Sequence, residues 1–347
     1  MKLRGSAVAV TLHDVARASG VSIKTVSNVI NDYPHIKPET RQRVQDAIEQ
    51  LGYQPNLSAR GLRSGRTGAI SLVIPDLKNA YFAELADAVM RAAAQHDIFV
   101  LIQQSDGDRD RELEILRGPR MRMVDGVLFS VLGLGQADAA LVDIPTPLVL
   151  LGERIFDGPT DHVTMQNVEA ARAATEHIAA LGRTRILAFG AHPNEIIGSA
   201  GLRLAGYRQG LETAGLPYRE ELVVNVDAWH RGDGADAMRG ALDSGISFDG
   251  VVAFNDSIAL GAMRVMQDAG LRIPNDVAVI GFDDIDETRY SLPTLTTVDP
   301  GRDEIAETAV RVLLERIAAA GGDPIAPREL RADFRIVSRE STAVTKA

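Results

Sequence analysis

The stretch Thr11–Asn31, TLHDVARASGVSIKTVSNVIN, predicts two short helices separated by a tight turn. Each half carries apolar residues at i, i+3 and i+4 spacing, which places them on one helix face: Leu12, Val15 and Ala16, then Val26, Val29 and Ile30. The segment Gly20-Val21-Ser22 interrupts this pattern, and Ser22 is a good N-cap for the second helix. That helix turns polar residues outward: Lys24, Ser27, Asn28 and Asn31. The pattern is typical of a helix-turn-helix whose second helix enters the DNA major groove.

The bulk composition indicates a globular chain of two or three domains. Its 347 residues exceed one ordinary domain, and 45% hydrophobic and 24% charged residues are ordinary proportions. No apolar run reaches the roughly 18 to 20 residues of a membrane span, and the first ten residues are too weakly apolar for a signal peptide. The chain has no Cys, which excludes disulfide and thiolate chemistry and fits a reducing cytoplasm.

Charge is distributed unevenly along the chain. Residues 1–66 carry ten Lys and Arg against five Asp and Glu, a net charge of +5. Because the whole chain has a net charge of −10, the remaining residues carry −15. A small basic segment on a large acidic body is the asymmetry of a DNA-binding module attached to a part that does not touch DNA.

A third helix and a basic segment complete the N-terminal part. The helix is expected from Pro38, which suits the first helical position, to about Leu51, with Gly52 closing it. The segment QPNLSARGLRSGRTG follows at 54–68 and carries three arginines around Leu62. By themselves these residues leave open a short helix at 57–63 or a flexible basic linker.

From Ala69 the pattern changes to aliphatic, strand-like runs that alternate with helical segments. The first series of runs is 70–74, 98–103, 126–131 and 147–151, with helices near 81–95 and 108–117. The second series is 185–190, 222–226, 250–255 and 277–282, with helices at 168–181, 202–214, 233–243 and 256–269. A helix at 303–319 and a strand near 328–337 complete the chain. This alternation predicts an α/β core of two doubly wound parallel sheets, each buried on both faces.

Polar and aromatic residues gather where these runs end, at the edge where ligands of such sheets bind. The set is Asp76, Asn79, Tyr81 and Phe82 after the first run, Glu153 and Arg154 after 147–151, Arg203 after 185–190, Trp229 after 222–226, Asn255 and Asp256 after 250–255, Asp283 and Asp284 after 277–282, and Asp299 in the final crossover. Aromatic rings stack on the apolar face of a sugar, while Arg, Asp and Asn bind its hydroxyls. The set therefore favours a polyhydroxylated ligand.

Taken singly, these residues have structural alternatives. Tyr81 and Phe82 fit a helix core, Asp256 an N-cap, Arg203 an ion pair, and Trp229 packing between lobes. Their convergence at six strand ends favours one shared site. No Gly-x-Gly-x-x-Gly, P-loop or His-Glu-x-x-His motif is present, so no cofactor, metal or enzymatic activity is expected, although acid–base work by the carboxylates is left open.

The helix pair, the QPNLSARGLRSGRTG segment and the alternating body together resemble the LacI/GalR family of bacterial transcription regulators over residues 10–340. The resemblance implies a disordered leader at 1–9, a three-helix helix-turn-helix domain at 10–56, a hinge helix at 57–66 and a two-lobed, periplasmic-binding-protein-like effector core at 67–347. The first lobe would hold about 67–167 and 300–330, and the second about 168–299 and 331–340.

The resemblance also implies which residues touch DNA. Ile23, Lys24 and Asn28 would face base edges, and Leu62 would wedge into the minor groove and kink the duplex. The remaining DNA-contacting positions are Thr11, Ser22, Thr25, Ser27, Asn31 and Ala59. Asn28 departs from the arginine common in the family, and asparagine pairs with adenine where arginine favours guanine. Lys37 stands where the family often has a serine N-cap, which predicts a looser first turn of the third helix.

For the core, the resemblance implies that Arg203, Trp229, Asn255 and Asp283 contact the effector, with Asp76, Tyr81, Phe82, Arg154 and Asp299 around them. The implied protein is a cytoplasmic, nucleoid-associated homodimeric repressor. It binds pseudo-palindromic operator DNA with an affinity set by a small ligand, most favourably a sugar. A corepressor-dependent, purine-type regulator, a sugar-binding protein and a carbohydrate-acting enzyme are the alternatives.

Overall fold

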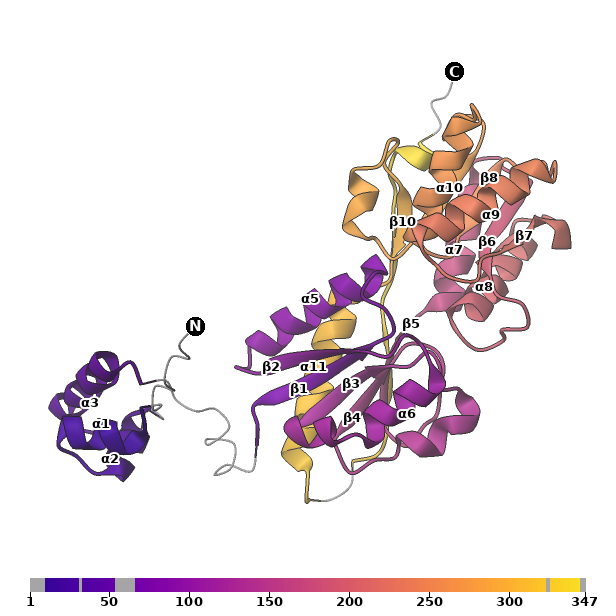
Figure 1. Cartoon of the computed structure of the whole chain (residues 1–347). Coiled ribbons are helices and arrows are strands. Elements are labelled where there is room, and N and C mark those ends of the chain that lie inside the picture. Colours follow the sequence, from indigo (N-terminus) through magenta and orange to yellow (C-terminus); the bar gives the residue numbers. More distant parts are fainter. Residues whose placement is uncertain (1–9, 31–32, 54–65, 323–324, 344–347) are drawn as a thin grey trace, which may run out of the picture. The chain divides into compact units, whose positions relative to one another are not determined.

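The computed structural model describes residues 10–30, 33–53, 66–322 and 325–343. The chain divides into two compact units, Met1–Thr67 and Gly68–Ala347, called here the head and the core (Figure 1). The expected leader at 1–9, most of the expected hinge helix at 57–66, and the positions Asn31, Ala59 and Leu62 lie outside the described residues. No helix in the described part of the chain is long and apolar enough to cross a membrane.

The head is built from three helices around one small apolar core. They are α1 (Leu12–Ser19), α2 (Ile23–Ile30) and α3 (Pro38–Leu51). The buried residues are those that the periodicity placed inward, joined by Tyr53: Val15, Ala16, Val26, Val29, Val44 and Ala47. Gly20 ends α1 with a φ of 69° and Gly52 ends α3 with a φ of 60°, left-handed values that glycine adopts without strain. The expected helix-turn-helix is therefore present.

The first lobe of the core is a six-stranded sheet in which every strand is parallel to its neighbours. Its order is β11 (Glu329–Ala332), β5 (Asp161–Met165), β4 (Leu148–Leu151), β3 (Gly126–Ser130), β1 (Ala69–Ile74) and β2 (Phe99–Gln104). Side chains alternate between faces, so Ile70, Leu72 and Ile74 pack with α5 (Ala80–Ala94) and α11 (Arg302–Ala319). Val73, Val127 and Phe129 pack with α6 (Arg109–Arg117) on the other face. Both faces are buried at the inner strands, as parallel pairing requires, whereas the edge strand β2 is largely exposed.

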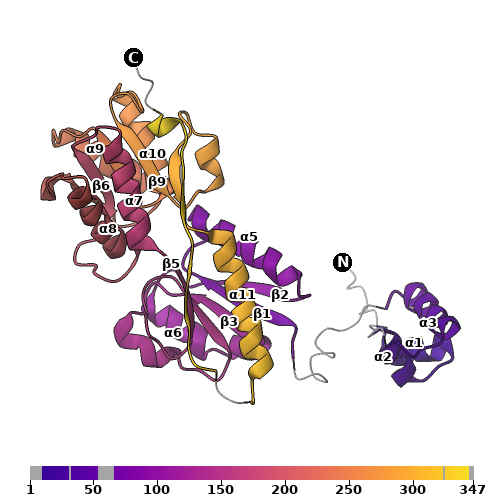
Figure 2. The same cartoon turned by 180° about the vertical axis from the view of Figure 1, so that it is seen from behind.

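The second lobe repeats this plan. Its sheet has the order β12 (Arg335–Val337), β10 (Thr296–Asp299), β9 (Ala278–Phe282), β8 (Gly250–Ala253), β6 (Ile186–Ala191) and β7 (Val223–Asn225), and β12 alone is antiparallel to its neighbour. The helices are α7 (Asn167–Ala180), α8 (Ser199–Thr213), α9 (Arg231–Asp243) and α10 (Asp256–Asp268). Helices α9 and α10 lie in front of this sheet in Figure 1, whereas α7 lies in front in the reverse view of Figure 2. The predicted fold class is confirmed.

The chain passes between the lobes three times, between β5 and α7, between β10 and α11, and between β11 and β12. The single strand expected near 328–337 is therefore two strands in different sheets. The third crossing, from β11 into the second lobe, comes after Ala332, two residues later than the boundary expected at about 330.

The aliphatic pattern of the sequence does not predict two of the strands, β5 and β10, because their residues, DHVTM and TTVD, are largely polar. Both are nevertheless buried, since tertiary partners satisfy their side chains. The carboxylate of Asp161 is fully buried and accepts hydrogen bonds from Arg316 Nε at 2.8 Å and Arg328 N at 2.8 Å. In β10, the Thr297 hydroxyl donates to Asp256 Oδ1 at 2.7 Å. A buried polar side chain with such partners is tolerated in a sheet.

Replacing Asp161 with asparagine should lower the free energy of unfolding of the core by about 3 kcal/mol, because it leaves two arginines without their buried carboxylate. Burial acts to raise the pKa of Asp161, but the hydrogen bonds from Arg316 and Arg328 hold it at about 2. The folded pKa is thus depressed, so this stabilisation is present above about pH 4 and is lost as the pH falls toward 2. Denaturant titrations of the two proteins at pH 7 and pH 3 measure both effects.

The matched control for this prediction is Asp268→Asn, which breaks the exposed pair with Arg264 and should cost less than about 1 kcal/mol. Equal losses in the two variants would contradict the structural role of Asp161.

Candidate functional site

The outward face of α2 carries most of the residues expected to touch DNA. Lys24 is exposed, and Ser27 and Asn28 are half-buried on the same helix. Ile23, at the start of the same helix, is partly buried and packs against the apolar core of the head. The described residues therefore present Lys24, Ser27 and Asn28 as the polar surface of this helix.

The polar residues at the starts of α1 and α2 are engaged in capping. Ser22 Oγ accepts the Thr25 N–H at 3.1 Å and lies 2.9 Å from Thr25 Oγ1, so the expected N-cap is present. The Thr11 hydroxyl donates to Asp14 Oδ2 at 2.6 Å, and the Thr11 N–H donates to the same oxygen at 3.0 Å. Lys37 makes no side-chain hydrogen bond as the cap of α3, as its lack of an acceptor predicts. These caps orient α2 without using its outward face.

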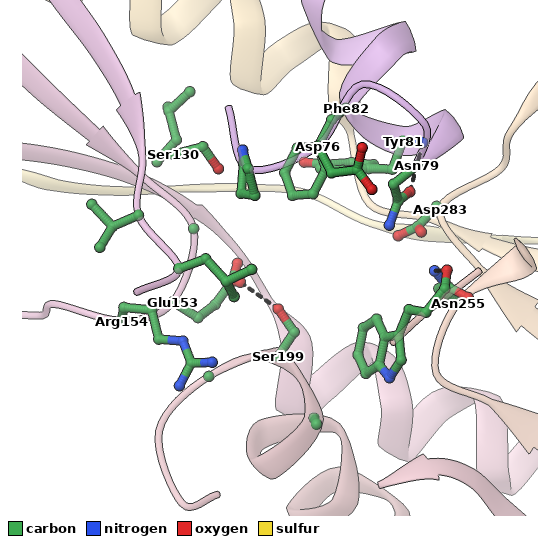
Figure 3. Close-up of a pocket in the computed structure, with 18 of the residues that line it drawn as sticks. Asp76, Asn79, Tyr81, Phe82, Ser130, Glu153, Arg154, Ser199, Asn255 and Asp283 are labelled. Atoms are coloured by element: carbon green, nitrogen blue, oxygen red, sulfur yellow. Dashed lines mark hydrogen bonds between the residues drawn. The ribbon is translucent and has the colours of Figure 1, made fainter. Parts of the chain in front are cut away.

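A cavity of about 310 Å³ lies between the two lobes of the core (Figure 3). This volume is at the low end of the roughly 300–1,000 Å³ of small-molecule sites. Eight of the nine expected effector residues line it: Asp76, Tyr81 and Phe82 after β1, Arg154 after β4, Arg203 on α8, Trp229 after β7, Asn255 after β8 and Asp283 after β9. The strand ends of both lobes therefore converge on one space.

Asp299 is the exception, since it does not line this cavity. Its Oδ1 accepts the Gly301 N–H at 3.0 Å, and its Oδ2 lies 2.9 Å from Arg335 Nη2. The carboxylate is therefore used inside the crossover, where it joins the start of α11 to β12. Its effector contact is implied by the family resemblance alone, and here its side chain is engaged by the neighbouring backbone and arginine.

Arg203 organises the floor of the cavity although it is almost fully buried. Its Nε donates to Asn167 Oδ1 at 2.8 Å, its Nη1 donates to the Phe254 carbonyl, and its Nη2 lies 3.8 Å from Asp283 Oδ1. The guanidinium also stacks over the Phe282 ring, 3.6 Å from the centroid. A planar cation that is stacked and hydrogen-bonded in this way is held in one orientation.

The aromatic and amide residues of the second lobe form a connected wall. Trp229 Nε1 donates to the Gly190 carbonyl at 3.1 Å, and Asn255 Nδ2 donates to the Trp229 carbonyl at 3.1 Å. Asn255 is also the N-cap of α10, because its Oδ1 accepts the Ile258 N–H at 2.9 Å. Asp256, the alternative cap, is fully buried and instead accepts the Ile285 N–H at 3.1 Å, which supports the loop that carries Asp283.

Polar contacts between the lobes close over the cavity. The Ser199 hydroxyl on α8 donates to Glu153 Oε2 at 2.6 Å, the contact drawn in Figure 3. His230 Nε2 lies 3.1 Å from Asp76 Oδ2, and Arg154 Nη2 donates to Glu195 Oε2 at 3.3 Å. Ser199, His230 and Glu195 were missed as site residues, because their roles depend on partners in the other lobe that the sequence does not reveal.

Burial shapes the protonation of Asp283. The carboxyl is 5% exposed, and burial raises its pKa to about 7, although Arg203 and Arg302 act to lower it. Its backbone φ of 117° lies in the left-handed region, which is unfavourable for a residue with a side chain. The cavity thus offers ring faces, an ionisable acid and fixed hydrogen-bonding groups, which suit a hydroxylated ligand. Among the described residues, no cluster of His, Asp or Glu could hold a metal ion.

Family models match the two units separately. Residues 11–56 match the model for bacterial regulatory proteins of the lacI family, and residues 175–342 match the model for a periplasmic binding protein-like domain. The ribose operon repressor of Escherichia coli (strain K12) is 33% identical over 309 residues, which cover 88% of this chain and 93% of that repressor.

Two solved structures share the fold. A protein of Sanguibacter keddieii DSM 10542 assigned to the LacI family is 52% identical, with a TM-score of 0.75 over 81% of this chain and 100% of that one. The lac repressor dimer bound to operator and the anti-inducer ONPF is 26% identical, with a TM-score of 0.81 over 97% of this chain and 100% of that one. A helix-turn-helix head on a two-lobed core with an interlobe cavity defines a ligand-responsive DNA-binding regulator. The chain belongs to the LacI family of bacterial transcriptional regulators.

The titration of Asp283 should appear in the stability of the core. Because its folded pKa is raised above the ordinary value, the protonated form stabilises the fold below about pH 4, and this contribution is lost as the pH rises through 7. Asp283→Asn imitates the protonated acid at every pH. The variant should match the wild type in free energy of unfolding at pH 3, below the unfolded pKa, and exceed it at pH 8, as measured by urea titration. A constant difference between the two proteins at both pH values would refute this assignment.

Proposed function

We propose that this protein is a sequence-specific transcriptional repressor whose operator affinity is controlled by a small ligand, most favourably a sugar, bound in the interlobe cavity. The convergence of eight expected effector residues from both lobes on that cavity carries the proposal. A ligand that contacts both lobes stabilises one arrangement of them over another. Because coupling between two sites is reciprocal, a ligand that favours the arrangement that DNA disfavours lowers operator affinity by the same factor.

The DNA-binding surface is the outward face of α2. Ile23, Lys24, Ser27 and Asn28 are the candidates for groove contacts. Ser22 and Thr25 stand at the N-terminus of the helix, where backbone N–H groups attract a phosphate. Thr11 lies at the corresponding position of α1. Asn31, Ala59 and Leu62 complete the proposed set by family resemblance. Asparagine at position 28 predicts an adenine in the operator half-site.

The ligand class follows from the chemistry of the cavity wall. Phe82 and Trp229 offer ring faces, while Asn255, Asp76 and Asp283 offer oxygen and amide groups for hydroxyls. A relative is named for the ribose operon, which supports a sugar. A purine-type corepressor is the second candidate, since the same rings would stack on a base. In that case ligand would raise operator affinity instead of lowering it.

We propose that the working form is a homodimer in the bacterial cytoplasm. The edge strand β2 exposes Phe99 (67%), Leu101 (38%) and Ile102 (37%), apolar side chains that a second copy would cover. The related lac repressor was solved as a dimer on its operator. Two-fold protein symmetry suits a pseudo-palindromic site. The relatives are transcriptional regulators, and we propose that this chain has no enzymatic activity.

A gel-shift titration with a pseudo-palindromic operator, run with and without sugars and purines, tests the proposal. The operator comes from binding-site selection with the full-length protein, and the ligand panel comes from a thermal-shift screen, since binding raises stability by mass action. A sugar that raises the melting temperature and releases DNA supports the proposal. A ligand that tightens DNA binding supports the corepressor alternative, and hydrolysis of a sugar would establish an enzyme.

Arg203→Ala should abolish the response to the ligand and leave operator affinity within about twofold, because the residue lies in the core cavity and orients Asp283 and Phe254. A reporter assay in the presence of the identified ligand measures the response. Since Arg203 is buried, the melting temperature of the variant serves as the folding control. Trp229→Leu, at a partly buried lining position, tests the same assignment. Retained induction in both variants would refute the assignment of the cavity as the effector site.

Leu62→Ala should weaken operator binding by several kcal/mol, roughly the stacking energy that an apolar wedge must offset when it kinks a base step. The ligand affinity of the core should stay unchanged, because Leu62 precedes the core unit Gly68–Ala347 in the chain. Gel-shift titration measures the operator affinity, and calorimetric titration of the same preparation measures the ligand affinity. Unchanged operator affinity would contradict the proposed role of Leu62.

A further inference from the structure

The cavity is strongly acidic. Six carboxylates line it: Asp76, Asp106, Glu153, Glu195, Asp227 and Asp283. Two guanidinium groups, Arg154 and Arg203, oppose them. A cavity that must hold a phosphate or a carboxylate normally supplies cations with free hydrogen-bonding positions. In this cavity acidic side chains outnumber guanidinium groups by six to two.

Neither guanidinium is free to receive an anion. Arg203 is almost fully buried and already contacts Asn167, the Phe254 carbonyl and Asp283. Arg154 is engaged by the 192–198 loop of the second lobe, where its Nη2 donates to Glu195 Oε2 and its Nη1 donates to the Ile197 carbonyl, both at 3.3 Å. A ligand anion would have to compete with carboxylates that the protein has placed there itself.

Glu195 already uses the hydrogen-bond donors that an anionic ligand would need. Its carboxylate accepts the Ala200 N–H at 3.1 Å and the Gly201 N–H at 3.4 Å, at the N-terminus of the 15-residue helix α8. His192 Nδ1 lies 2.9 Å from Glu195 Oε2. Burial acts to raise the pKa of Glu195, but His192, Arg154 and the Gly201 N–H outweigh it and lower the pKa, so the group is held as an anion.

The loop is shaped closely around this carboxylate. Gly198 has a φ of 129°, and a Cβ at this position would lie 2.4 Å from Glu195 Oε1. A Cβ on Gly201 would lie 2.4 Å from the Glu195 carbonyl oxygen. Glycine at these two positions therefore lets the loop fold the glutamate back onto the helix N-terminus. The arrangement is a built position for one negative charge.

We propose that Glu195 is a specificity-determining residue: it fills the anion-binding position of the cavity, so that the cavity accepts uncharged polyhydroxylated ligands and rejects phosphorylated or acidic ones. This role rests on the proposed function, since it concerns which ligands the effector cavity takes. A phosphate placed beside Glu195 would face a like charge in a partly buried setting, and it would have to remove Glu195 from four partners to reach the amides of α8.

Isothermal titration calorimetry of the full-length protein with inorganic phosphate, ribose, ribose 5-phosphate, glucose and glucose 6-phosphate tests this role. The wild type should bind neither phosphate nor the phosphorylated sugars. Glu195→Ala frees Arg154, His192 and the α8 amides, and should bind a phosphorylated probe at least about tenfold more tightly than the wild type, the scale of one charge-assisted hydrogen bond. Glu195→Gln removes the charge but keeps the shape, and should show a smaller gain.

Asp227→Ala is the matched control, because it removes one carboxylate from the same cavity without opening the helix N-terminus. It should not gain phosphate binding. An equal gain in Asp227→Ala would show that net charge alone excludes anions, and it would overturn the assigned role of Glu195. Binding of a phosphorylated sugar to the wild type more tightly than its neutral parent would overturn it as well, as would the absence of any gain in both folded Glu195 variants.

These outcomes separate the role of Glu195 from the proposed function. Binding of inorganic phosphate to the Glu195 variants requires neither operator DNA nor an identified sugar. A wild type that responds to no sugar, together with variants that gain phosphate, would count against the sugar effector and support the role of Glu195.

Discussion

Parallel pairing of the strands is the constraint on which the rest of the core depends. A parallel sheet must be covered on both faces, and most connections between its strands contain a helix that returns the chain to the same edge. The carboxyl ends of the parallel strands then meet at one edge of each sheet, and the residues that follow these strands meet with them. Two such sheets, joined by three crossovers, place these residues around one cavity. The site is a consequence of the topology.

Within that frame, a few buried charges hold the cavity in shape. Arg203 joins α8 to the end of β8 and to the start of α7, and it lies against the ring of Phe282 at the end of β9. Asp256 holds the loop that carries Asp283, and Arg302 at the start of α11 donates to the Asp283 carbonyl at 2.9 Å. A group buried without such partners would cost several kcal/mol, so each charge also fixes the position of its neighbours. Binding residues and structural residues are therefore partly the same residues.

Much of this arrangement was predictable from the sequence. The periodicity of Leu12–Ile30 and the aliphatic runs identified the head helices and most core strands, since those elements bury an apolar face of regular period. Eight of nine expected cavity residues were found by their place after a strand. Asp299, expected from the family resemblance, ends the polar strand β10 and turns to Arg335. Position along a strand gives no information about which partner a side chain finds.

Local periodicity and composition are enough to predict most of the helices and strands, the helix-turn-helix and the class of residues at the strand ends. Which polar segments are strands depends on the three-dimensional fold, since β5 and β10 are buried only because arginines and a distant aspartate satisfy them. The fold also decides that Arg154 is engaged by Glu195, from a loop 41 residues away in the chain. Such pairings depend on distances that close only when both lobes are folded, and no local pattern encodes them.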